Sequence, residues 1–156
     1  MLNKDLFHQI SAQKSITNAV LSGNGTTTTG AKVDRRGYNG ATVMVEVGAP
    51  GDALSVSISQ TIKLQDSDDD STYNDVVAAN LMTETGVGAG ADGVVCVLDG
   101  GTLRNGSRCY TAGYIGGKRY LKVLAVRLGN NATGTPIAAS ILLGPPQWPG
   151  MGGTNQ

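Results

Sequence analysis

Strict alternation of apolar and polar residues is the feature that most limits what this chain can fold into. From Leu54 to Leu64 every even-numbered residue is apolar except Gln60, while the odd-numbered residues are serine, threonine or lysine. Residues 41–47 alternate in the same way. Successive side chains of a β-strand point to opposite faces, so this pattern predicts strands with one buried and one solvated face.

Further strands are predicted along the chain, separated by glycine-rich turns. Arg119–Leu128 is apolar on both faces, which is typical of a central strand that is partly covered on both sides. Residues 137–143 predict the last long strand, which Gly144-Pro145-Pro146 should end because proline cannot donate to a ladder. Shorter strands are predicted at Ser15–Val20, Val94–Leu98 and Tyr110–Ile115.

Helical signals are nearly absent, and this decides the fold class. A short helical turn or two near residues 76–82 is the only candidate, and no long stripe of period 3.6 exists. Seven or eight strands with short turns between them predict an all-β protein. We expect an antiparallel β-sandwich or jelly roll with extended loops and a C-terminal tail.

The 156 residues suffice for one domain with a core of its own. Glycine-rich stretches at 23–30, at 86–93 and in the tail hold too few large side chains to fix themselves. We therefore expect an N-terminal segment at 1–30 that includes a flexible Gly/Thr loop. A β-sandwich domain should follow at 31–144, and a Pro/Gly-rich tail at 145–156.

The charge balance narrows the class of partner. Basic and acidic residues both number 12, the formal net charge is zero, and only 15% of residues are charged. Proteins that bind nucleic acid or anionic membranes usually carry a basic excess, so neither partner is expected. No apolar run approaches the roughly 20 residues that span a bilayer. So few charges are typical of a surface that partners cover.

Neither catalysis nor metal binding is predicted. A nucleophile needs a positioned imidazole, and the only histidine, His8, lies near the N-terminus outside any predicted strand. Asp66, Asp68 and Asp70 match positions 1, 3 and 5 of a calcium loop, but serine and valine stand where that loop has glycine and glutamate. We expect a hairpin turn here, with an opportunistic cation site as the alternative. No catalytic residue, cofactor or metal ligand is expected.

The two cysteines lie on predicted strands. Cys96 stands between two valines, and Cys109 stands between arginine and tyrosine. Two buried thiols are expected in a reducing cytoplasm. A bridge across neighbouring strands is the alternative.

Four segments, in this order and spacing, resemble small structural proteins that tailed bacteriophages encode among their head genes. They are Val33–Tyr38 with the valine-rich strand after it, Lys63–Val76, Gly113–Val123, and Ala138–Leu143 with Gly144-Pro145. The resemblance covers roughly residues 30 to 146. It implies a virion component without enzymatic activity, plausibly a capsid decoration or cement protein, which is a small β-rich domain, often trimeric, on the outer capsid surface.

The resemblance also implies partners and a location. The partners would be the major capsid protein and further copies of this chain, most simply in a homotrimer. The chain would be made in the host cytoplasm and end on the virion surface. A role at the head–tail junction or in the tail is the neighbouring alternative. The acidic hairpin followed by an aromatic residue also resembles carbohydrate-binding β-sandwiches, which adds an adhesion module as a further alternative, although only 4% of residues are aromatic.

The tail is predicted to make contacts with a partner. One large aromatic residue and one adaptable thioether lie there among residues that break helices and strands, so they cannot form a core of their own but can enter a neighbour's pocket. The alternative is that the tryptophan folds back to plug one end of its own sandwich. The predicted interface residues are Pro145, Pro146, Trp148 and Met151.

Overall fold

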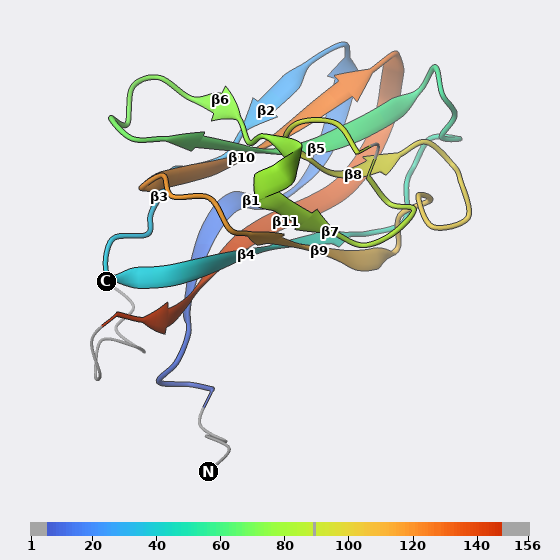
Figure 1. Ribbon diagram of the computed structural model, residues 1–156. Coiled ribbons are helices and arrows are strands. Elements are labelled where there is room, and N and C mark those ends of the chain that lie inside the picture. Colours follow the sequence, from blue (N-terminus) through green and yellow to red (C-terminus); the bar gives the residue numbers. More distant parts are fainter. Residues whose placement is uncertain (1–5, 89, 148–156) are drawn as a thin grey trace.

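Two antiparallel β-sheets pack face to face in the computed structural model, which describes residues 6–88 and 90–147 (Figure 1). Sheet A has the order β1-β11-β4-β9-β7. In sheet B the path is β2-β10-β5-β6, with β3 also paired to β10 and β8 also paired to β5. The predicted all-β sandwich is therefore confirmed.

The strand bounds show how the chain moves between the two sheets. Sheet A consists of β1 (Ser11–Asn24), β4 (Tyr38–Val47), β7 (Leu81–Thr83), β9 (Arg108–Tyr114) and β11 (Asn130–Pro146). Sheet B consists of β2 (Thr27–Thr29), β3 (Val33–Asp34), β5 (Ser59–Ser67), β6 (Asn74–Asp75), β8 (Val94–Leu98) and β10 (Tyr120–Leu128). A single 3₁₀ turn, η1 (Ala78–Asn80), stands where the short helical signal was predicted.

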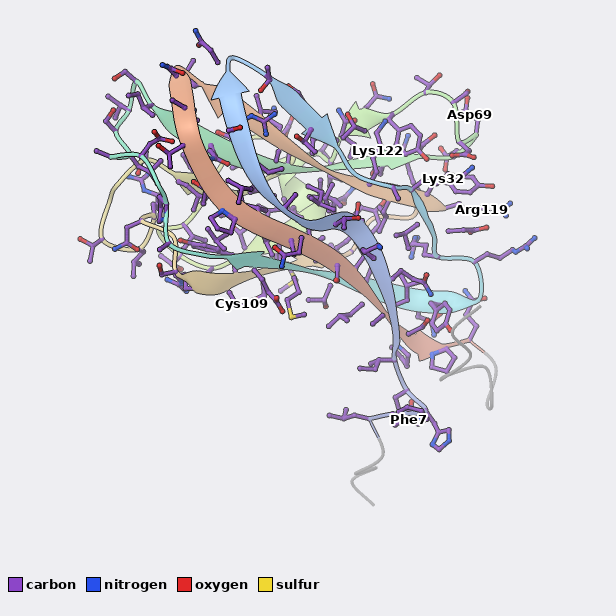
Figure 2. All side chains as sticks on the ribbon, turned by 180° about the vertical axis from the view of Figure 1, so that it is seen from behind. Phe7, Lys32, Asp69, Cys109, Arg119 and Lys122 are labelled. Atoms are coloured by element: carbon purple, nitrogen blue, oxygen red, sulfur yellow. The ribbon has the colours of Figure 1, made fainter. Side chains whose placement is uncertain are left out.

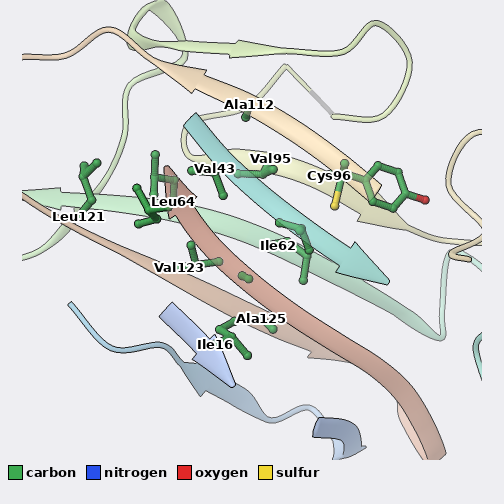
Figure 3. Close-up of a cluster of buried hydrophobic side chains, with 14 of the residues drawn as sticks. Ile16, Val43, Ile62, Leu64, Val95, Cys96, Ala112, Leu121, Val123 and Ala125 are labelled. Atoms are coloured by element: carbon green, nitrogen blue, oxygen red, sulfur yellow. The ribbon is translucent and has the colours of Figure 1, made fainter. Parts of the chain in front are cut away.

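The core lies between the sheets and is filled by the alternation seen in the sequence. Ile62 and Leu64 of β5 and Val123 of β10 are fully buried, as is Val43 of β4. Figure 3 shows these side chains together between the strands of both sheets. Each buried aliphatic side chain of this kind stabilises the fold by about 1.5–3 kcal/mol.

The alternation starts earlier than the strand that it predicts. β5 begins at Ser59, and Ser55 and Ile58 instead close a tight turn with backbone N–O distances of 2.9 and 3.2 Å. The Ser55 hydroxyl also accepts a hydrogen bond from the Ile58 amide at 3.1 Å. Val56, on the turn, is 82% exposed. The predicted strand is wrong over residues 54–58, because a serine that bonds its own backbone favours a turn over a ladder.

The prediction of a flexible Gly/Thr loop is also wrong. Thr27–Thr29 forms β2 and pairs with β10. Arg127, buried on β10, donates to the hydroxyls of Thr26 and Thr28 at 2.7 and 3.0 Å. A buried guanidinium needs hydrogen-bond acceptors, and the threonines supply them. The expected boundary at residue 30 therefore does not exist in the fold, since residues 11–29 contribute strands to both sheets.

The last strand is longer than predicted at both ends. β11 begins at Asn130 and continues to Pro146, which pairs with Tyr38. Pro136 lies inside β11, and its carbonyl accepts from Gly48, just beyond the end of β4. Its missing N–H therefore falls outside the β4 ladder, which makes proline tolerable there. Figure 1 shows β1 and β11 curving together toward sheet B, and three register shifts interrupt their pairing.

Ser15 joins the two sheets at one edge, and its loss should be measurable. Its hydroxyl accepts from the Val123 amide at 3.0 Å and donates to the Ala31 carbonyl at 2.8 Å. Ser15→Ala leaves a buried amide unpaired, so we expect the free energy of unfolding to fall by about 1–3 kcal/mol in denaturant titrations. Thr17→Ala, exposed on the same strand, is the control. Equal losses in the two variants would show that Ser15 does not join the sheets.

Candidate interaction surface

Large apolar side chains are exposed at the end of the sandwich where the described chain begins. Leu6 is 68% exposed and Phe7 72% exposed, and Ile10 is also exposed. Figure 2 shows Phe7 on the N-terminal segment, which projects from the body. Clustered exposed apolar residues of this kind mark interaction surfaces more often than isolated ones do.

A groove lies beside this segment. Its cavity of about 340 Å³ is lined on one side by the N-terminal segment and on the other by the ends of β4 and β11: Leu6, Gln9, Ile10, Thr42, Leu142, Leu143, Gly144 and Pro145. Gly144 permits the close approach, because a Cβ there would lie 2.5 Å from the Gln9 carbonyl oxygen. We call this cavity the apolar groove.

A second cavity lies at the beginning of β4. It has a volume of about 280 Å³ and is lined by Arg35, Arg36, Gly37, Tyr38, Asn39, Gly117, Arg119 and Gln147. Thr42 pairs with Leu142 at the groove, and Tyr38 pairs with Pro146 at the second cavity. We call the second cavity the arginine pocket. Both cavities therefore lie at the end of the sandwich where β4 begins and β11 ends.

The predicted interface residues fall partly on this surface. Pro145 lines the apolar groove and is exposed, whereas Pro146 is half-buried in the ladder with Tyr38. Trp148 and Met151 lie outside the described residues. The exposed side chains of Leu6 and Phe7 were missed. One signal could have indicated them: Phe7 is the only phenylalanine of the chain, and it lies outside every predicted strand.

The acidic run forms the predicted hairpin between β5 and β6. Asp69 closes it, and its Oδ1 atom accepts from the amides of Ser71 and Thr72 at 3.0 and 2.9 Å. These hydrogen bonds hold the pKa of Asp69 well below its usual range. Asp70 follows with a φ of 59°, a left-handed conformation that aspartate tolerates better than most residues.

The three carboxylates at the calcium-loop positions turn to different partners. Asp66 accepts from the Tyr114 hydroxyl at 3.0 Å, Asp68 lies 3.5 Å from the Lys118 ammonium, and Asp70 accepts from the Tyr73 hydroxyl at 2.6 Å. Over residues 6–88 and 90–147, no group of three or more His, Cys, Asp or Glu residues is placed to hold a metal ion.

Tyr114 and Asp66 connect the two sheets through a buried hydrogen bond. Tyr114 lies on β9 of sheet A, and Asp66 lies on β5 of sheet B, 5% exposed. The Tyr114 oxygen also accepts from the Lys118 amide at 3.1 Å. Burial, reinforced by the carboxylate, raises the pKa of Tyr114 to about 12. The link fixes the turn that carries Gly117 and Arg119 to the core.

The two thiols are not bridged, and their environments differ. Cys96 is buried on β8, where burial raises its pKa to about 12. Cys109 is exposed on β9 in the other sheet, so the expectation of a second buried thiol is wrong. Cys109 directly precedes Tyr110, whose side chain faces the core, so the Cys109 side chain lies on the opposite face of β9.

The aromatic ring after the acidic hairpin, that of Tyr73, is half-buried and has a cation over one face. The Lys122 ammonium lies 3.8 Å from the centroid of the Tyr73 ring. A sugar that stacks on this ring would first have to displace the cation. Separately, in the part of the chain that the structure describes, no helix has the length and apolar character to cross a membrane.

Comparison with known proteins gives a fold likeness alone. No protein-family model matches the chain, and no curated protein matches it in sequence. Among solved structures, the fold is similar to that of the SPBc2 prophage-derived protein YomS, with a TM-score of 0.46 and 13% sequence identity. The match covers 86% of this chain and 92% of that chain. At this level the likeness carries no inference about function.

Proposed function

We propose that this chain is a structural protein of a bacteriophage virion, and specifically a capsid decoration protein that stabilises the head by binding the major capsid protein. It acts by binding, without catalysis, on the outer surface of the shell. The sequence resemblance over roughly residues 30 to 146 supports the class. The exposed apolar end of the sandwich supports the mode of action.

The exposure of Leu6 and Phe7 beside the apolar groove is the observation that carries the proposal. Both side chains point into water in the isolated chain. Burying a leucine or phenylalanine fully yields roughly 1.5–3 kcal/mol each, so a partner that covered both would gain about 3–6 kcal/mol. A short exposed segment on a rigid body suits a protein that clamps a shell.

Self-association is the second part of the proposal, and a trimer is its simplest form. The outer face of β10 carries Leu124 and Val126, which are only half-buried within one copy. This face is the second apolar face that the sequence predicts for the strand. Few charges on the chain would oppose close packing of copies.

Cosedimentation with genome-free shells of the cognate major capsid protein tests the proposal. We expect the purified chain to pellet with the shells and to saturate at a fixed ratio to the capsid protein. Saturable binding to tails or connectors alone would instead place the chain at the head–tail junction or in the tail. Binding to glycans on an array without shell binding would support the adhesion alternative, which the Lys122 ammonium over the Tyr73 ring disfavours.

A further inference from the structure

We infer that the arginine pocket receives a carboxylate side chain from an acidic segment of the protein partner. This inference rests on the proposed function and adds the partner's chemistry to it. The bound segment is extended and carries an apolar residue for the apolar groove and an acidic residue for the arginine pocket.

The pocket has more positive charge than its own acids neutralise. Three guanidinium groups line it, and one neighbouring carboxylate, that of Asp34, pairs with Arg119 at 2.6 and 3.0 Å. Arg36 is exposed, and only its backbone amide bonds to Asp34, at 2.9 Å. Within the described residues its side chain makes no hydrogen bond or close ion pair, and its charge acts on Asp34 only at longer range, where it helps to lower the pKa of that carboxyl. Arg36 is therefore the cation that is available to an incoming anion.

Arg35 has a different task, because it holds the pocket together. Its guanidinium donates to the backbone carbonyls of Lys118, Gly116 and Asn39, the last two at 2.8 and 3.3 Å. The side chain also lies over the Tyr114 ring, 5.3 Å from its centroid. These contacts fix the Gly116–Arg119 turn against the start of β4. A pocket that is preorganised in this way loses little conformational entropy when an anion binds.

The size of the pocket favours a single side chain. Its volume of about 280 Å³ is at the lower limit of the roughly 300–1,000 Å³ of typical small-molecule sites. An arginine fork matches the geometry of a carboxylate and can bind it through two hydrogen bonds. Arg119 also lines the cavity, and its Nη1 atom takes no part in the pair with Asp34.

The spacing of the two cavities sets the spacing of the partner's residues. Thr42 lines the groove and Tyr38 lines the pocket, and the two lie four residues apart on β4. Strands rise about 3.3 Å per residue, so the two positions lie about 13 Å apart along the strand. An extended partner segment would therefore place its acidic residue about four residues from its apolar one.

Charge reversal at the pocket tests the inference on shells. We expect Arg36→Glu to weaken shell binding about tenfold and to reduce its dependence on salt. Lys14→Glu makes the same charge change on an exposed part of β1 and should change binding less than twofold. Gly117→Glu places a carboxylate in the pocket, where a Cβ meets no atom within 4 Å, and should match Arg36→Glu. Equal binding by Arg36→Glu and Lys14→Glu would overturn the inference.

A peptide probe separates this inference from the proposed function. Acetylated, amidated hexaglutamate should bind the wild-type chain and bind Arg36→Glu at least about fivefold more weakly. Peptide binding of this kind would support the assignment of the arginine pocket even if the chain did not bind shells. Failure to bind shells would contradict only the proposed decoration role. An oligothymidylate of equal charge that bound as tightly as the peptide would overturn the assignment to an acidic peptide. Thermal melts of each variant confirm that it is folded.

Discussion

Tyr114→Phe is expected to lower the free energy of unfolding by about 3 kcal/mol, although it removes a single oxygen atom. The change removes the hydroxyl that bonds the buried Asp66 carboxylate and accepts from the Lys118 amide. A buried carboxylate that loses its partner keeps its desolvation penalty, which is why the loss exceeds that of an ordinary hydrogen bond. Denaturant titration of both proteins measures the difference.

The matched control is Tyr120→Phe, which removes a hydroxyl from a half-buried position in sheet B. This control should change stability by less than about 0.5 kcal/mol. A similar small change in Tyr114→Phe would contradict the role of the Tyr114–Asp66 pair as the connection between the sheets.

The same tyrosine predicts a dependence on alkaline pH. The pKa of Tyr114 is about 12 in the folded chain, against about 10 in an unfolded one. The unfolded chain therefore releases this proton first, so the stability that neutral Tyr114 contributes is complete below pH 10 and is lost as the pH rises toward 12. Tyr114→Phe should lose stability less steeply than wild type over this interval, and parallel curves would contradict the assignment.

Replacing Leu6 and Phe7 together by aspartate should weaken shell binding at least about 30-fold, since buried interface anchors contribute 2 kcal/mol or more. Both side chains are largely exposed in the isolated chain, so the folded domain should lose little by the change. We expect the melting temperature to shift by less than about 2 °C. Cosedimentation measures the affinity, and calorimetry measures the melting temperature.

Val56→Asp is the matched control for this pair. Val56 is also a highly exposed apolar residue, but it lies on the Ser55–Ile58 turn rather than beside the groove. Shell binding should be unchanged in this variant. Equal weakening by Val56→Asp would mean that exposed apolar area in general, and not the N-terminal segment, drives binding.

The central strands were predictable because their burial repeats with period two. Ile62 and Leu64 alternate with polar neighbours in the sequence, and they occupy the core in the fold, where those neighbours are only half-buried. Alternation failed at Val56, where a local serine hydrogen bond outweighs the pattern. β2 was missed because three threonines in a glycine-rich segment show no apolar period, and its partner, Arg127, lies about a hundred residues away in sequence.

The candidate surface was less predictable than the fold. Pro145 was identified from its place after an apolar strand, and it does line the groove. The pocket depends on Arg35, Arg36 and Arg119, which come from two distant segments that meet only when β3 pairs with β10. Tyr114 and Asp66 are brought together in the same way, by the packing of one sheet on the other. No local pattern in the sequence predicts contacts between residues so far apart in the chain.

A reconstruction of the phage particle with and without this chain is the most direct test of the decoration role. We predict difference density for the sandwich on the outer surface of the shell, with the end that carries Leu6, Phe7 and the arginine pocket against the major capsid protein. Particles without the chain should show bare shells at those positions. The account would be contradicted by shells identical in the two reconstructions, or by density in which the opposite end, at the Ser55–Ile58 turn, faces the capsid protein.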